Sequence, residues 1–146
     1  MLKLTEEALM GTVYTEITLK NAGDNVRVSD GRITEQEVRT TTVRALVDTG
    51  AGSLIISEQV REKLGLAVKG LRSAALANGG REVCRLTEPV EIHWKDRYTT
   101  CHALVLPGVE DVLLGAIPLE DMDLLVDPAR RELTGAHGDE VVCMVK

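Results

Sequence analysis

The most informative stretch of the chain is an apolar segment that ends abruptly in Asp48-Thr49-Gly50. The residues before it, Ala45-Leu46-Val47, have the aliphatic character of a buried strand. An ionised carboxylate is costly to remove from water, so a buried strand normally avoids delivering an aspartate to its end. A chain with this pattern either turns into solvent at Asp48 or presents an acid for chemistry. The first alternative is an ordinary solvated turn, in which these residue types are also common.

The elements that must position this motif are predicted to be short strands joined by turns. Alternating apolar and polar residues and β-branched runs predict strands at residues 13–20, 37–47, 53–56, 71–77, 81–86, 90–94, 98–106, 123–126 and 141–145. Short helices are expected after a cap at Ser57, ending at Gly65, and at residues 116–122. The polar stretch 21–37 is expected to form a long loop or a loose hairpin. The fold class is therefore all-β, closed and barrel-like or a sandwich, with one or two short helices.

Two further segments follow the Asp48 motif in the chain. Asn78-Gly79-Gly80, between two predicted strands, is a strong signal for a hairpin turn. Val112-Leu113-Leu114-Gly115 is an apolar run closed by a glycine. Taken singly, the first segment is common in hairpins and the second is more often plain core. Because both segments follow the Asp48 motif in this order, they are more informative together than either is alone.

With these three features in this order, the sequence resembles the retropepsin-like aspartic proteases, a single-domain class found in retroviruses and in some bacterial proteins. The resemblance extends from Val13 to Leu133 and is closest to the small bacterial members. It implies an acid protease fold in one domain, residues 1–146, with no metal or organic cofactor. It assigns catalysis to Asp48, Thr49 and Gly50, and substrate binding to Ala51 and to a flap formed by Ala77, Asn78, Gly79 and Gly80.

The chemistry of this class needs two carboxylates about 3 Å apart that share one proton, because like charges this close cannot both ionise. The chain contains one Asp-Thr-Gly motif. Asp127 also follows an apolar run, but Pro128 stands where the hydroxyl should be, so we reject it as the second acid. We predict a two-fold homodimer that brings Asp48 against its own copy. The Thr49 hydroxyl can then link the two loops by hydrogen bonds.

Three features of the sequence are compared with the viral members of this class. Viral-type dimers interleave both termini in a shared sheet, and residues 141–145 are the candidate for that role on apolar character alone. The stretch 21–37 is longer than its counterpart in compact viral enzymes. A serine at position 51 could donate a hydrogen bond that favours the ionised aspartate, whereas Ala51 cannot. We therefore predict a less acidic working pH than that of serine-bearing relatives.

Composition excludes several other classes of protein. The net charge is −6 and the basic residues are scattered, which argues against a nucleic-acid-binding surface. The three cysteines (Cys84, Cys101 and Cys143) lack Cys-x-x-Cys spacing, which favours reduced thiols in a cytosolic chain. The histidines (His93, His102 and His137) lack metal-ligand spacing, and we interpret Ala136–Asp139 as a polar turn. Residues 1–10 do not resemble a signal peptide, and no stretch approaches the length of a membrane span, so we expect a cytoplasmic protein.

The sequence thus predicts an aspartic endopeptidase, a hydrolase that acts on peptide or protein substrates as a homodimer. The alternative is a non-catalytic peptide- or protein-binding module that keeps this fold, since a fold does not determine a function. A strict monomer would favour this module. A third hypothesis is that the protein processes itself or a neighbour in a larger assembly.

Overall fold

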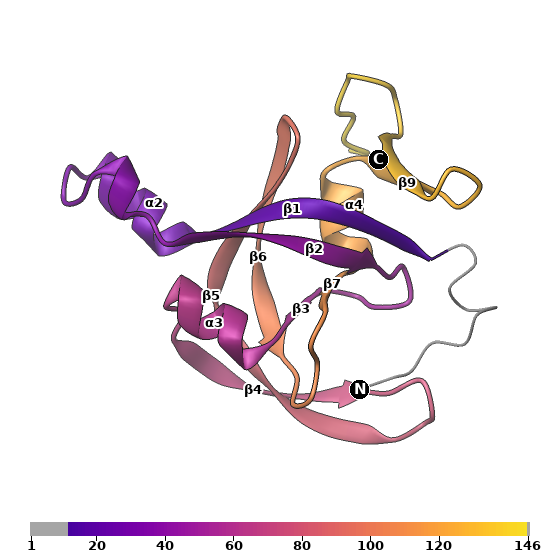
Figure 1. The fold of residues 1–146 in the computed structure, drawn as a ribbon, viewed down its shortest axis with the longest axis horizontal. Helices are drawn as coiled ribbons and strands as arrows, with labels where there is room; N and C mark the ends of the chain where they lie inside the picture. Colours follow the sequence, from indigo (N-terminus) through magenta and orange to yellow (C-terminus); the bar gives the residue numbers. More distant parts are fainter. Residues whose placement is uncertain (1–11, 146) are drawn as a thin grey trace.

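The structure is a computed structural model that describes residues 12–145, and it consists mainly of strands (Figure 1). The strands are β1 (Val13–Asn21), β2 (Thr40–Val47), β3 (Leu54–Ile56), β4 (Val68–Ala75), β5 (Arg81–Trp94), β6 (Arg97–Val105), β7 (Val112–Leu114), β8 (Leu124–Asp127) and β9 (Glu132–Gly135). The helices are α2 (Ala22–Ser29), the 3-10 turn η1 (Glu35–Glu37), α3 (Glu58–Leu64) and α4 (Ala116–Asp121). The first ten residues, for which the sequence predicts no signal peptide, lie outside the described range. No helix within residues 12–145 is long and apolar enough to cross a membrane.

Six strands close into a barrel. They follow the order β1-β2-β7-β3-β6-β5, and β5 pairs with β1 to complete the ring. β2 and β7 run parallel, as do β3 and β6, and the other neighbours are antiparallel. β4 extends the sheet as the hairpin partner of β5, and β8 and β9 form a separate two-stranded sheet. The predicted closed all-β architecture with a few short helices is confirmed.

The barrel interior is aliphatic, as a chain without phenylalanine requires. Its fully buried side chains include Ile17, Leu19, Leu54, Ile56, Leu64, Leu66, Val90, Ile92, Val105 and Leu114. The single tryptophan, Trp94, is also buried, and its indole N–H donates to the Thr15 hydroxyl at 2.9 Å. Burial of these side chains is the main force that holds the strands in one barrel.

The helix α3 has the ends that the sequence predicts. The Ser57 hydroxyl accepts a hydrogen bond from the Val60 amide at 3.2 Å, which satisfies one free donor of the first turn. Gly65 ends the helix with a φ of 62°, a left-handed conformation that glycine adopts without strain.

The prediction of a loop or hairpin at residues 21–37 was wrong, because α2 and η1 occupy most of this stretch. The Asn21 side chain caps α2 by accepting from the Asp24 amide at 3.0 Å, and it donates to the Leu64 carbonyl at 2.8 Å. The buried Asp24 carboxylate accepts from the Arg39 guanidinium at 2.9 Å. This hydrogen bond lowers the pKa of Asp24 to about 2. A long-range ion pair therefore folds a segment whose local composition favours turns.

The chain after β8 also differs from the prediction. Residues 141–145 form no strand, and the Val142 amide donates instead to the Asp123 carboxylate at 2.9 Å. The strand β9, which the sequence analysis missed, pairs with β8 across a turn in which Asp127 accepts from the Ala129 and Arg130 amides. The two strands expected at 81–86 and 90–94 are one strand, β5, with a register shift between Leu86 and Pro89.

Candidate active site

The Asp48 motif lies where β2 leaves the barrel. Val47, the last residue of β2, pairs with Leu114 of the parallel strand β7. The next amide, that of Asp48, donates to the Leu114 carbonyl at 3.0 Å, so the ladder continues as far as the acid. The Asp48 side chain is partly buried, whereas Thr49 and Gly50 are exposed. The sheet therefore fixes the backbone of the acid and leaves its carboxylate at the surface of the barrel.

The carboxylate is held by its own loop. The Gly50 amide donates to Asp48 Oδ1 at 2.9 Å, and the Ala51 amide donates to the Asp48 carbonyl at 3.1 Å. A β-carbon on Gly50 would lie 3.2 Å from the same Oδ1, which is tighter than an ordinary contact. Within residues 12–145 the Asp48 carboxylate accepts no other hydrogen bond, and the Thr49 hydroxyl has no partner. One oxygen of the acid and the hydroxyl beside it are thus available to groups outside this chain.

Backbone contacts fasten the loop to the start of α4. The Ala116 amide donates to the Ala51 carbonyl at 2.8 Å, and the Ile117 amide donates to the Gly52 carbonyl at 3.1 Å. Gly115, just before these amides, packs directly on the backbone of residues 51–53. The structure therefore brings together two of the three motifs of the sequence analysis, the Asp48 loop and the apolar run that ends at Gly115. The roles of Ala116 and Ile117 could not be predicted from the sequence, because a hydrogen bond between backbone groups leaves no side-chain signal.

The third motif forms the tip of the β4–β5 hairpin, as predicted. The Leu76 amide donates to the Gly80 carbonyl at 2.8 Å, and the Asn78 side chain accepts from the Gly80 amide at 2.8 Å. Gly79 has a φ of 86°, which a residue with a side chain rarely adopts. Residues 77–80 are exposed, and in Figure 1 the hairpin tip and the loop after β2 lie toward the same side of the barrel. No hydrogen bond among the described residues joins the tip to the Asp48 loop.

An ion cluster supports the hairpin at its base. Glu58, the first residue of α3, accepts from Arg61 of the same helix at 2.9 Å and also pairs with Arg85 of β5. The hydrogen bond from Arg61, reinforced by that from Arg85, lowers the pKa of Glu58 to about 2. The cluster links α3 to the hairpin strand β5 at neutral pH.

Other candidate groups of the sequence analysis have local roles. The Asp127 carboxylate accepts two backbone hydrogen bonds within the β8–β9 turn. In the sequence this turn lies far from the Asp48 motif. The three cysteines are free thiols, and burial raises the pKa of Cys101 to about 11. The predicted polar turn at Ala136–Asp139 is present, with His137 bonded to Asp123. Among residues 12–145 no group of three His, Cys, Asp or Glu side chains is placed to hold a metal ion.

Comparison with known proteins gives a family and two similar solved structures. The family model described as aspartyl protease matches residues 25–117, a range that contains all three motifs. The EIAV protease complexed with the inhibitor HBY-793 is 21% identical, with 75% of this chain and 86% of that chain covered and a TM-score of 0.49. The retroviral protease-like domain of Ddi1 from Leishmania major is 17% identical, with 84% and 86% covered and a TM-score of 0.49. No curated protein matches the chain.

The family model spans more than half of the chain and includes the strand that carries Asp48, the loop after it and the Gly115 segment that holds the loop. The aspartic protease family expected from the sequence is therefore confirmed. This chain belongs to the aspartyl protease family.

Proposed function

We propose that the protein is an aspartic endopeptidase that acts as a homodimer, with one Asp48 from each subunit in a shared site. The observation that carries the proposal is the loop of one subunit, which holds a single carboxylate with one oxygen free of partners within residues 12–145. Two such loops related by a two-fold axis supply two acids, and the exposed Thr49 of each loop is available to bond with the other.

In this mechanism the two Asp48 carboxylates share one proton and hold a water molecule between them. The ionised carboxylate takes a proton from the water as the water oxygen attacks the scissile carbonyl carbon. The protonated carboxyl donates a hydrogen bond to the carbonyl oxygen and stabilises the charge that develops there. The proton taken from water then passes to the leaving amide nitrogen as the C–N bond breaks. The protein supplies the geometry, and no metal or organic cofactor takes part.

The substrate is expected to lie extended beneath the β4–β5 hairpin. Extended peptides bind well to exposed strand edges, because their backbone groups complete a hydrogen-bond ladder. The tip, Ala77–Gly80, closes over the bound peptide and excludes bulk water. Asn78, Gly79 and Gly80 give the tip a defined turn. Ala51, whose amide donates to the Asp48 carbonyl, is the loop residue expected to contact the substrate beside the acid.

The second candidate function is a peptide-binding module without turnover. It is favoured by the same single carboxylate, because an isolated subunit cannot bring two Asp48 side chains together. A protein that stays monomeric at working concentration, and also when an extended peptide is bound, would support this module. Size-exclusion chromatography and sedimentation velocity separate the two functions before any substrate is known.

The direct test is cleavage of a peptide library by the parent protein and by the Asp48→Asn variant. The variant keeps the size of the side chain and an acceptor oxygen for the Gly50 amide, so the loop is expected to fold normally. We expect cleavage by the parent, none by the variant, and inhibition of the parent by a statine-type compound whose hydroxyl takes the place of the attacking water. Equal cleavage by both proteins would remove Asp48 from the mechanism.

A further inference from the structure

The strand β4 is an open edge of the sheet. It pairs with β5 and with no other strand among residues 12–145, and it lies along the lower rim of the molecule in Figure 1. The register shifts between Val68 and Gly70, so the regular edge extends from Gly70 to Ala75. The backbone N–H and C=O groups of an open edge are free to pair with another extended chain. β4 is therefore a place at which a further strand can be added.

The free backbone groups of this edge belong to Leu71, Ser73 and Ala75. In an antiparallel ladder, opposed residues alternate between pairs that exchange hydrogen bonds and pairs that do not. At the hairpin tip the Leu76 amide donates to the Gly80 carbonyl at 2.8 Å, so these two residues form a bonded pair. Counting back along the register, the three residues belong to non-bonded pairs, and their backbone groups point away from β5. No backbone hydrogen bond outside the β4–β5 ladder involves them within the described part of the chain.

The solvent side of the hairpin carries two exposed apolar side chains. Leu71 lies opposite Arg85, and Val83 lies opposite Ser73, so all four side chains share one face. The buried Cys84 lies on the other face. Leu71 is 69% exposed and Val83 is 58% exposed. Because side chains alternate along a strand, a strand added to β4 would cover Leu71 with every second side chain.

The hairpin is a positively charged region of an acidic chain. Residues 68–86 contain four Lys or Arg side chains and one acid, Glu82, although the net charge of the chain is −6. One of the four, Arg85, is paired with α3. Lys69 and Arg72, both exposed on β4 itself, form no ion pair among residues 12–145. The open edge is thus flanked by two cations whose charge is not neutralised by an ion pair.

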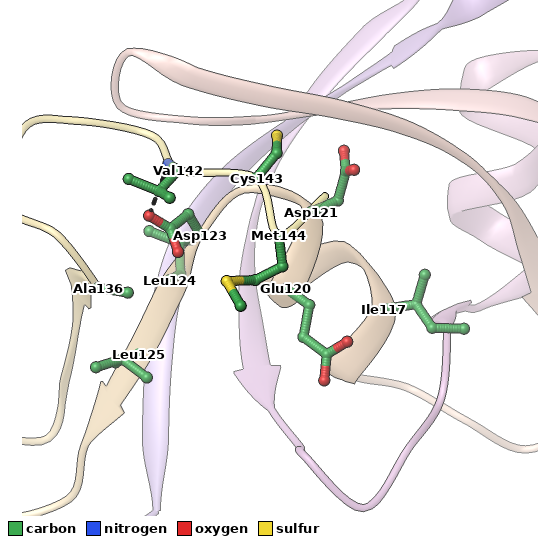
Figure 2. Close-up of a pocket in the computed structure, with 10 residues that line it drawn as sticks. All are labelled: Ile117, Glu120, Asp121, Asp123, Leu124, Leu125, Ala136, Val142, Cys143 and Met144. Carbon is green, nitrogen blue, oxygen red and sulfur yellow. Dashed lines mark hydrogen bonds between the residues drawn. The ribbon is translucent and has the colours of Figure 1, made fainter. Parts of the chain in front are cut away.

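These charges select one kind of occupant. A second copy of β4 would bring the same Lys69 and Arg72 to the edge and would be repelled, whereas an acidic segment is attracted. The pocket beside α4 has the opposite preference, because Glu120, Asp121 and Asp123 are among the residues that line it (Figure 2). Of these two surfaces, only the β4 edge suits an acidic chain.

We propose that an extended acidic segment of another protein binds to β4 as an added strand. Its backbone pairs with Leu71, Ser73 and Ala75, its apolar side chains cover Leu71, and its acidic side chains lie on the other face beside Arg72. Leu71 and Ser73 lie nearer the base of the hairpin than the tip, Ala77–Gly80, under which the cleaved peptide is expected. The site therefore goes beyond the proposed function and does not require catalysis.

Two matched peptides test the site. One alternates valine and glutamate over the length of β4, 8 residues, and the other has lysine in place of glutamate. Both are capped at their ends and are added to the Asp48→Asn protein, so that neither is cut. We expect the glutamate peptide to slow hydrogen exchange of the Leu71, Ser73 and Ala75 amides and to bind at least about tenfold more tightly than the lysine peptide. Raising the salt concentration from about 0.05 M to about 0.5 M is expected to weaken its binding.

Two pairs of substitutions separate the charge from the backbone edge. Arg72→Glu reverses a charge on β4, and Arg32→Glu makes the same change at an exposed position after α2. Ser73→Pro removes an N–H that points away from β5 and keeps the ladder, whereas Ser73→Ala keeps that N–H. We expect Arg72→Glu and Ser73→Pro each to raise the dissociation constant of the glutamate peptide at least about tenfold, and both controls to change it less than about twofold. Urea unfolding confirms that each variant is folded.

Three results would overturn this proposal. Equal binding of the two peptides would show that the cations on β4 select nothing. Unchanged binding to a folded Ser73→Pro variant would show that the peptide does not pair with the edge of β4. No binding of the glutamate peptide at any concentration would remove the site. None of these results bears on the homodimeric protease, which cleavage by the parent protein tests separately.

Discussion

Gly115 lies so close to Ser53 that position 115 has no room for a side chain. A β-carbon there would lie 2.3 Å from the Ser53 carbonyl oxygen, and 2.6 Å from the carbonyl oxygen of Ala51. The same Ala51 carbonyl accepts from the Ala116 amide at 2.8 Å. β7 and the Asp48 loop are thus held together backbone to backbone, and this contact explains why the apolar run before α4 ends in glycine.

Gly115→Ala is expected to destabilise the fold by about 1–3 kcal/mol, because backbone atoms cannot yield to the added methyl as a flexible side chain can. The measurement is urea unfolding of the variant beside the parent. Gly70→Ala is the control, since nothing lies within 4 Å of the added carbon there. Equal unfolding midpoints for Gly115→Ala and the parent would contradict the close packing.

Acid is expected to destabilise the fold through two carboxylates. The pKa of Asp24 is about 2 and that of Glu58 is about 2, both below the ordinary values of 3.8 and 4.5. Because the folded values are lowered, both groups stabilise the fold above about pH 4.5 and lose this contribution as the pH falls toward 2. The buried Asp24 accounts for on the order of 2 kcal/mol of this change.

The measurement is the free energy of unfolding between pH 2 and pH 7 for the parent and for Asp24→Asn. The variant is expected to be less stable than the parent at pH 7 and to depend less on pH between 4.5 and 2. Parallel curves for the two proteins would show that the ion pair of Asp24 with Arg39 does not contribute.

Arg97→Met is expected to cost about 3 kcal/mol or more, because it leaves carbonyl groups at residues 122, 123 and 138 without their donor. Thermal unfolding with hydrogen exchange of the Ala136 and Val142 amides measures the effect. Arg130→Met is the matched control, since the Arg130 side chain is 75% exposed and its ion pairs are long. We expect the control to change stability by less than about 0.5 kcal/mol. A similarly small effect at Arg97 would show that these three hydrogen bonds contribute little to stability.

Ala51→Ser is expected to move the pH–rate profile toward acid. The new hydroxyl can donate to the ionised carboxylate next to it and favour that form at lower pH. The measurement is kcat/KM against pH for the parent and the variant on one peptide substrate. A parent profile that already peaks below about pH 3, or no shift in the variant, would contradict the role given to Ala51.

The elements that sequence analysis predicted well depend on local signals. Ser57 and Gly65 mark the two ends of α3 because caps are read from neighbouring residues. Asn78-Gly79-Gly80 marks the tip of the β4–β5 hairpin for the same reason. The Asp48 motif and Gly115 are both local patterns, and the structure adds the backbone hydrogen bonds that join them.

The elements that sequence analysis missed depend on partners far away in the chain. The helix α2 forms in a turn-like sequence because Asp24 forms an ion pair with Arg39, fifteen residues later in the chain. Residues 141–145 have the apolar character of a strand. The Val142 amide, however, donates its hydrogen bond to the Asp123 carboxylate and not to the backbone of a neighbouring strand. The hydrogen bonds that Arg97 and Asp123 make to residues 136–142 could not be predicted, because neither residue lies in a recognisable motif.

The central claim is that two Asp48 carboxylates act together across a subunit boundary. It is tested most directly by peptide cleavage in mixtures of parent and Asp48→Asn subunits at constant total protein, after the subunits have exchanged. If a site needs both acids, only parent–parent dimers are active, and an equal mixture retains about one quarter of the parent activity. Activity of about one half, in proportion to the parent fraction, would show that each subunit works alone and would contradict the account.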